Sequence, residues 1–239
     1  MVTLQPAGLF PEIIELDEVD STNRYALDEA RPGLLVRARR QTSGRGRRGR
    51  SWFSPKGDNL YMTATLAPPR DHLPIIAGIA VRAAIARLIP CAAVALKWPN
   101  DIVVSGRKIC GILCETRAGL TAVGMGINVN QSEWPEGLAH RAVSLRQIAG
   151  RVFDLDEIAS MMAGDLSVWT ETYDAQGFVP LRTEFLEHGL LKGYEVFDDR
   201  GRLCSIVDLT LDGHLVIESD GGRRSLVGES ISIGWKDYP

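Results

Sequence analysis

The segment best suited to chemistry is an arginine- and glycine-rich stretch at residues 44–50, with the sequence GRGRRGR. Glycine can adopt positive φ and lets backbone N–H groups approach a ligand closely, while guanidinium groups present paired donors to phosphate or carboxylate oxygens. The stretch therefore predicts a site for a phosphate-bearing ligand. Taken alone, it leaves a solvated basic loop or a nucleic-acid-binding patch as an equal alternative.

The positive charge of the chain is concentrated around this stretch. The whole chain has 27 Lys and Arg against 30 Asp and Glu, a net charge of −3. Residues 37–50 hold seven arginines and no acidic residue, so the remainder has 20 basic and 30 acidic residues, a net charge of −10. This distribution excludes a uniformly basic nucleic-acid-binding surface and is compatible with one concentrated anion site.

Residues suited to a nucleotide follow the basic stretch. Trp52 comes directly after the cations, where its ring could stack on a purine, although a lone tryptophan more often belongs to the core. Residues 97–101, with the sequence KWPND, place a lysine, an amide and a carboxylate around a proline turn. Lys108 opens an apolar strand and is predicted to project into a cleft, unless its stem only covers apolar surface at the strand end.

A glycine-containing segment lies further along, at residues 123–130, with the sequence VGMGINVN. Its two glycines lack side chains and would leave room for a ligand against the backbone. Asn128 in this segment could contact the edge of a base. A bulged or twisted strand is the alternative, because two glycines spaced in this way are a weak signal.

Length and composition indicate a globular protein of 239 residues, 45% hydrophobic and 24% charged. At ~150 residues per domain the length corresponds to about 1.6 domains, which favours one large domain with a small appendage. The four cysteines, Cys91, Cys110, Cys114 and Cys204, form no C-x-x-C pair and are predicted to be buried free thiols.

The chain shows no targeting or membrane-spanning signal. Its first residues lack the basic and continuous apolar regions of a signal peptide. The longest apolar stretch, Ile75–Ile89, is interrupted by Arg82 and Arg87 and is too short to span a bilayer, so we predict a core helix. These features predict a cytoplasmic protein.

Hydrophobic patterning predicts the elements that hold these motifs. Strands, in a mainly antiparallel sheet, are predicted at Glu12–Asp17, Leu60–Leu66, Ala93–Lys97, Ile102–Val104, Lys108–Glu115 and Leu120–Val129. Helices are predicted at Tyr25–Ala30, Ile75–Ile89, Ile158–Tyr173 and Val179–Glu187; Asp20–Asn23 would cap the first and an Asp154/Glu157 capping box the third. From about residue 192, turns at 199–201, 212–213 and 220–222 predict short hairpins and a small barrel.

Taken in order, these motifs resemble those of the biotin protein ligases. The resemblance is strongest over residues 12–130 and continues more weakly at 227–231. It is carried by DSTN at 20–23, Gln41 with GRGRRG at 44–49, WFSP at 52–55, NLY at 59–61, KWPND at 97–101, Arg107 and Lys108 with GIL at 111–113, and GIN at 126–128. It implies an α+β fold: a catalytic domain at residues 1–190, with a mixed central sheet flanked by helices, followed by a small SH3-like β-barrel at residues 191–239.

The resemblance also implies a reaction in two steps. Biotin and MgATP would give biotinyl-5′-AMP and pyrophosphate, and a lysine of the biotin carboxyl carrier protein would then attack the mixed anhydride. ATP and biotin are substrates, Mg²⁺ accompanies the ATP, and no tightly bound protein metal site is expected. The chain begins shortly before the first predicted strand, so we do not expect the DNA-binding domain of some family members, nor a membrane partner. A homodimer stays open.

By match to the family pattern, the expected catalytic residues are Lys108, Arg45, Arg47 and Asp101. Biotin is expected to contact Ser21, Thr22, Asn23, Gln41, Gly44, Arg45, Gly46, Arg47, Tyr61, Thr63, Lys108, Gly111, Leu113, Gly124 and Ile127. ATP and the adenylate are expected to contact Asn23, Arg47, Arg48, Arg50, Trp52, Asn100, Lys108 and Asn128. Asp101 could hold Mg²⁺ indirectly, orient Lys97 or Lys108, or help to deprotonate the acceptor lysine.

Two other functions compete with this interpretation. Lipoate or octanoate ligases and transferases have a similar catalytic fold. Their corresponding loop is of a different type, RR-x-x-GGG, which this sequence lacks. A nucleic-acid-binding protein that uses residues 37–50 would show a steep dependence of affinity on salt.

Overall fold

The structure is a computed structural model that describes residues 8–188, 195–227 and 231–234. The predicted domain boundary between residues 190 and 191 lies outside the described residues. So do residues 228–230 of the segment that more weakly resembles the family.

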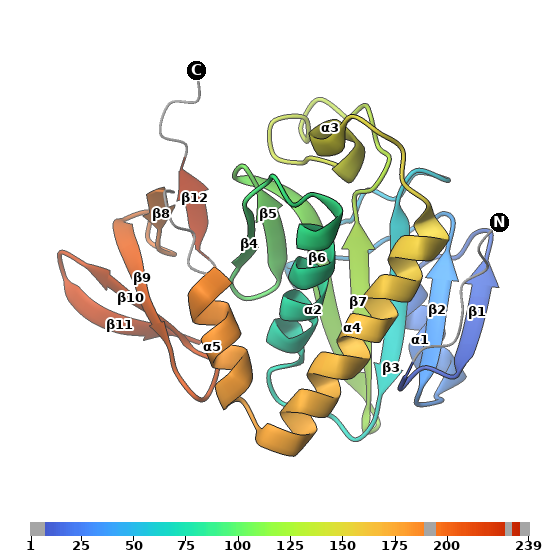
Figure 1. Cartoon of the computed structure of the whole chain (residues 1–239), viewed down its shortest axis with the longest axis horizontal. Coiled ribbons are helices and arrows are strands. Elements are labelled where there is room, and N and C mark those ends of the chain that lie inside the picture. Colours follow the sequence, from blue (N-terminus) through green and yellow to red (C-terminus); the bar gives the residue numbers. More distant parts are fainter. Residues whose placement is uncertain (1–7, 189–194, 228–230, 235–239) are drawn as a thin grey trace.

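A seven-stranded mixed sheet forms the larger part of the molecule (Figure 1). Its strands are β1 (Glu12–Leu16), β2 (Leu34–Ala38), β3 (Leu60–Leu66), β4 (Val94–Lys97), β5 (Asp101–Val104), β6 (Arg107–Arg117) and β7 (Leu120–Ile127). Their order in the sheet is β1-β2-β3-β7-β6-β5-β4. Strands β1 and β2 are parallel and the other neighbours are antiparallel, so the predicted mixed, mainly antiparallel sheet is confirmed.

Helices cover both faces of this sheet (Figure 1). They are α1 (Thr22–Glu29), α2 (Leu73–Leu88), α3 (Leu145–Ala149), α4 (Leu155–Gln176) and α5 (Val179–His188), with a short 3-10 turn, η1, at Arg47–Gly49. Helices α2 and α4 pack together on one face, and α1 packs against β2, β3 and β7 on the other. Helix α2 is a core helix, as predicted, and across the described ranges we find no helix with the length and apolar character that crossing a membrane requires.

The C-terminal part is a second, antiparallel sheet (Figure 1). Its strands are β8 (Glu195–Phe197), β9 (Leu203–Leu209), β10 (Leu215–Ser219), β11 (Gly222–Leu226) and β12 (Ser232–Gly234), in the order β11-β10-β9-β8-β12. The predicted turns are confirmed, because Gly201, Gly213 and Gly222 adopt positive φ of 74°, 76° and 91°. This arrangement is consistent with the predicted small SH3-like barrel.

The two sheets share a continuous hydrophobic core, which runs from α2 and α5 into Val196, Leu209 and Leu215. A polar contact also joins them: the indole Nε1 of the buried Trp98 donates a hydrogen bond to the Gly213 carbonyl at 3.0 Å. Trp98 belongs to the KWPND motif. The turn between β9 and β10 is therefore attached directly to that motif.

Several local predictions need correction. Ser21 is the N-cap of α1 but makes no capping bond with its side chain, and the nearby Asp20 Oδ1 accepts from Ser21 N at 2.7 Å. Asp154 caps α4, whereas the reciprocal capping box lies at α3, between Ser144 and Gln147.

The cysteines are free, as predicted, but not all are buried. Cys91 is exposed and Cys114 is half-buried, while Cys110 and Cys204 are buried. Cys91 lies in the short connection between α2 and β4, where the chain leaves the core. Burial raises the pKa of Cys114 to about 12 and that of Cys110 further, so these two thiols stay protonated and unreactive.

Candidate functional site

A pocket opens where the start of α1 and the segment 41–52 face strands β6 and β7. The facing strands are paired so that Gly111 lies opposite Gly126 and Leu113 opposite Gly124. A Cβ atom built on Gly124 would lie 2.2 Å from Asn23 Oδ1, and one built on Gly126 would lie 2.6 Å from the Trp52 ring. The missing side chains at Gly124 and Gly126 therefore leave room for Asn23 and Trp52 against the backbone, and the contact of these glycines with a ligand stays a prediction.

One end of the pocket, which we call the amide end, is lined by the uncharged side chains of Thr22, Asn23 and Gln41, and Thr63 supports them from behind. Gln41 Oε1 accepts hydrogen bonds from Thr22 N at 2.9 Å and from Thr22 Oγ1 at 3.1 Å. Thr63 Oγ1 lies 2.8 Å from both Thr22 Oγ1 and Asn23 Oδ1. Thr22, Asn23 and Thr63 are at most 4% exposed, so these donors and acceptors are fixed within the protein.

The other end, which we call the charged end, contains Lys108, Asp101, Arg47, Asn100 and Trp52. Lys108 Nζ lies 2.7 Å from Asp101 Oδ1 and 5.0 Å from the centre of the Trp52 ring. Arg47 Nη1 donates to Asn100 Oδ1 at 3.0 Å, and Asn100 Nδ2 donates to the Ile112 carbonyl at 2.7 Å. Strand register sets the spacing of the two ends, because Gly111 and Leu113 are two residues apart, about 7 Å along β6.

Cations crowd the charged end. Burial lowers the pKa of Arg47, and the charges of Arg48 and Arg50 lower it further against the opposing effect of Asp101. Burial also lowers the pKa of Lys97, the residue that pairs with Asp101 between β4 and β5, and Lys108 and Arg50 act in the same direction. An anion bound at this end would relieve this repulsion.

The arginine-rich segment is less uniform than its sequence predicts. Arg37 belongs to β2 and forms ion pairs with Asp156 and Glu15, and Arg40 pairs with Glu18 at 2.9 Å. Only the arginines from Arg45 onward therefore lie in the loop of the pocket. Among the three glycines of this loop, Gly49 adopts positive φ (72°), whereas Gly44 is needed for space, because a Cβ there would lie 2.6 Å from Ser54 Oγ.

The structure brings most of the predicted residues into one pocket. Its lining includes Ser21, Thr22, Asn23, Gln41, Arg45, Gly46, Arg47, Trp52, Tyr61, Asn100, Lys108, Gly111, Leu113 and Gly124. Asn23, which is predicted from the sequence to contact both ligands, lies at the amide end against Gly124, whereas Lys108 and Trp52 lie against Gly111 at the charged end.

Other predicted residues stand behind the lining or outside it. These are Gly44, Arg48, Arg50, Thr63, Asp101, Ile127 and Asn128. Strand alternation explains Ile127: Gly124 and Gly126 face the pocket, so Ile127 points to the opposite face and is fully buried in the core. Asn128 is 3% exposed, and its Nδ2 donates to the Lys108 and Val143 carbonyls at 3.1 and 3.2 Å, so contact with a base would fall to its amide oxygen.

Three lining residues and one neighbour were not predicted from the sequence. The three lining residues are Met62, Ile112 and Met125, whereas Gly126, which also lines the pocket, is one of the two glycines predicted to leave room for a ligand. The side chains of Met62, Ile112 and Met125 belong to the core, so it is their backbone that faces the pocket. The neighbour is Glu115, which the same alternation along β6 from Gly111 and Leu113 would have placed on the pocket face.

Comparison of the sequence with known proteins finds similarity to ligases of one family. The sequence profile of the Biotin/lipoate A/B protein ligase family matches residues 16–132. The chain is 32% identical over 240 residues to the biotin--[acetyl-CoA-carboxylase] ligase of Paracoccus denitrificans, covering 92% of this chain and 99% of that protein. It is 31% identical to the bifunctional ligase/repressor BirA of Escherichia coli, covering 91% of this chain and 73% of BirA.

Solved structures give the same result. The biotin protein ligase from Aquifex aeolicus in complex with biotin and ATP superposes with a TM-score of 0.84 at 30% identity, over 94% of this chain and 99% of that one. The ligase from Leishmania major in complex with biotinyl-5-AMP has a TM-score of 0.64 at 26% identity, over 91% and 99%. The chain belongs to the Biotin/lipoate A/B protein ligase family, and within this family to the biotin protein ligases.

Proposed function

We propose that this protein activates biotin with ATP and transfers it to a lysine of a biotin carboxyl carrier protein. In the first step an oxygen of the biotin carboxylate attacks the α-phosphorus of ATP, the bond to the β-phosphate oxygen breaks, and pyrophosphate leaves. In the second step the neutral lysine amine attacks the acyl carbon of biotinyl-5′-AMP, AMP leaves with the bonding electron pair, and the nitrogen loses a proton.

The observation that supports this proposal is that one pocket has two chemically different ends about 7 Å apart along β6. The cyclic urea of biotin is uncharged and needs both donors and acceptors, which suits the amide end. Its carboxylate, at the far end of an aliphatic chain, would then extend toward Lys108. Two similar structures support these ligands: the Aquifex aeolicus ligase is in complex with biotin and ATP, and the Leishmania major ligase is in complex with biotinyl-5-AMP.

Charge neutralisation at the charged end would supply most of the catalysis. A carboxylate and an α-phosphate repel one another, so a preorganised cation between them lowers the barrier. Lys108 is suited to this position, with Arg45 and Arg47 nearby on the loop. Trp52, which lies against Gly111 and Gly126, would stack on the adenine.

Asp101 is suited to orienting Lys108. Its carboxylate lies 2.7 Å from Lys108 Nζ, and this contact favours orientation over the other two roles that the sequence leaves open. Mg²⁺ would enter with the phosphates of ATP as part of the substrate. Because the Asp101 oxygen already pairs with a lysine, its contribution to Mg²⁺ would be indirect.

The test is biotin-dependent exchange of pyrophosphate into ATP, followed by transfer to a carrier domain. We expect exchange with biotin and none with lipoate or octanoate. Exchange with lipoate or octanoate alone would favour the sister ligases. A sequence-selective complex with double-stranded DNA at physiological salt, without any exchange, would favour the nucleic-acid-binding alternative. The cytoplasmic location and a homodimer stay predictions.

A further inference from the structure

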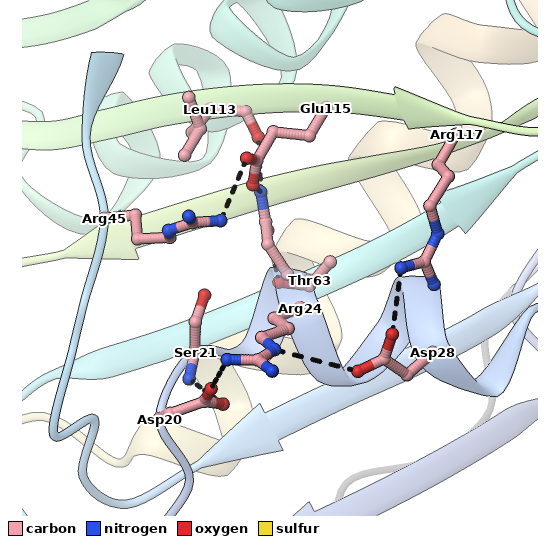
Figure 2. A network of polar contacts seen from close by, with 10 residues as sticks. Asp20, Ser21, Arg24, Asp28, Arg45, Thr63, Leu113, Glu115 and Arg117 are labelled. Atoms are coloured by element: carbon pink, nitrogen blue, oxygen red, sulfur yellow. Dashed lines mark hydrogen bonds and ion pairs between the residues drawn. The ribbon is translucent and has the colours of Figure 1, made fainter. Parts of the chain in front are cut away.

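Glu115 is the one carboxylate that strand alternation adds to the pocket face of β6 after Gly111 and Leu113, and the proposed reaction gives it no role. Its side chain is 31% exposed and contacts two residues of the pocket lining. Glu115 Oε2 accepts a hydrogen bond from Asn23 Nδ2 at 2.8 Å, and Glu115 Oε1 lies 3.4 Å from Arg45 Nη1. Figure 2 shows Arg45 reaching toward this carboxylate from the loop.

The contacts of Glu115 determine which way the Asn23 amide points. Asn23 Nδ2 also donates to the Leu113 carbonyl at 3.0 Å. A carboxylate and a carbonyl can only accept, so together they use both amide hydrogens of Asn23. Asn23 Oδ1 must therefore face Thr63, as observed at 2.8 Å.

The orientation of the Asn23 amide sets the direction of the hydrogen bonds made by Thr63 and Thr22. Thr63 has one hydroxyl hydrogen, and Asn23 Oδ1 can only accept, so this hydrogen is directed to Asn23 and not to Thr22. The Thr22 hydroxyl then donates to Thr63 or to Gln41 Oε1, and its oxygen keeps a lone pair for a ligand. Gln41 is fixed from its other side, since its Nε2 donates to Ser54 Oγ at 3.0 Å.

We propose that Glu115 is a positioning residue which, through Asn23, fixes the donor and acceptor pattern of the amide end and so selects the cyclic urea of the substrate. This inference rests on the proposed function, since it assigns the urea ring to that end. Thr22 then accepts from a ring N–H because its own hydrogen is already directed inward. Arg45 is a bystander in this role, held at the rim of the pocket by the same carboxylate.

The test uses two substitutions that differ only in hydrogen bonding. Glu115→Met removes the acceptor but keeps the length of the side chain, and we expect the KM for biotin in pyrophosphate exchange to rise about tenfold with kcat little changed. Glu115→Gln keeps an acceptor oxygen and should stay within about twofold of wild type. Glu218→Met, which removes an exposed carboxylate paired with Arg223 on the second sheet, is the matched control.

A second substrate separates positioning from simple loss of structure. In an analogue whose urea is replaced by a cyclic carbamate, an oxygen takes the place of one ring N–H, so a donor becomes an acceptor at the position that Thr22 contacts. Glu115→Met should lower the preference for biotin over this analogue, while Glu115→Gln should leave the preference as in wild type. Equal loss of affinity for both compounds in Glu115→Met would mean a structural role only and would overturn the inference.

Two double variants identify which contact of Glu115, that with Asn23 or that with Arg45, carries the effect. The effect of Glu115→Met should disappear in an Asn23→Ala background and persist in an Arg45→Ala background. The reverse pattern would assign the effect to the ion pair with Arg45 and overturn the inference. A wild-type protein without biotin-dependent exchange would refute the proposed function itself, whereas an active wild type with an unaffected Glu115→Met variant would refute only the role of Glu115.

Discussion

The two ends of the pocket solve opposite physical problems. At the amide end, Thr22, Asn23 and Thr63 are buried but satisfy one another with hydrogen bonds, so their burial carries little penalty. At the charged end, cations lower one another's pKa, and the buried Trp52 Nε1 has no hydrogen-bond partner among the described residues. The buried polar groups of the amide end therefore find hydrogen-bond partners within the protein. The cations of the charged end repel one another, and a bound anion would reduce this repulsion. Recognition and chemistry should therefore respond to different substitutions.

The largest expected effect is at the charged end. Lys108→Ala should slow adenylate formation by about a hundredfold or more, the size of effect typical for one preorganised electrostatic group, while the fold stays intact. Biotin affinity should fall much less, because the amide end is unchanged. The measurement is pyrophosphate release at saturating biotin together with calorimetric binding of biotin. Lys56→Ala, which removes a surface lysine paired with Asp17, is the control. Unchanged pyrophosphate release by a folded Lys108→Ala protein would contradict the assignment.

Thr22→Val should produce the opposite result. The substitution keeps the shape of the side chain and removes the hydroxyl oxygen whose lone pair is proposed to accept from the ligand, so biotin affinity should fall about tenfold. The rate at saturating biotin should change less, because no charge is lost. Titration calorimetry and single-turnover adenylate formation measure the two quantities. If the rate fell as far as the affinity, the separation of the two ends would be broken.

Arg47→Gly tests whether the loop retains the intermediate. We expect adenylate to form but to dissociate faster, by several-fold, because Arg47 joins the loop to Asn100 on the other side of the lining. Biotin should then label lysines of a bystander protein that lacks an acceptor domain. Arg40→Gly is the matched control from the same segment, since Arg40 pairs with Glu18 instead. Wild-type retention of adenylate with an unlabelled bystander would require another role for the loop.

The smallest expected effect concerns stability. Burial lowers the pKa of Lys97 below its usual 10.5, so the charged form destabilises the folded state, and this penalty disappears as the pH rises through the lowered pKa. Lys97→Met should therefore be more stable than wild type near neutral pH, and the difference should shrink at alkaline pH. Urea unfolding across this pH range measures it. A Lys97→Met protein that is less stable than wild type near neutral pH would mean that the partners of Lys97 stabilise its charged form.

Apolar runs and turn residues predicted most elements, because strands such as β3 and β7 are apolar segments bounded by turns and glycines mark the hairpins of the second sheet. Strand β2 was missed, since its apolar residues run directly into Arg37, which a sequence groups with the basic loop although it pairs with Asp156. The residues of the pocket were largely predictable from motifs. Their arrangement was not: which face Ile127 takes, and where the Asn128 amide points, depend on strand register and on contacts made by residues far apart in the chain.

The glycines at 111, 124 and 126 show how this pocket constrains evolution of the chain. Each glycine inside a strand sacrifices about 0.5–1 kcal/mol relative to alanine. An alanine at any of the three would therefore favour the sheet, yet its methyl group would collide with Lys108, Asn23 or Trp52. The gain from a less flexible backbone would therefore be offset by the displacement of side chains that belong to the pocket. Glycine at these three positions gives up local strand stability and in exchange lets Asn23, Lys108 and Trp52 lie directly against the sheet.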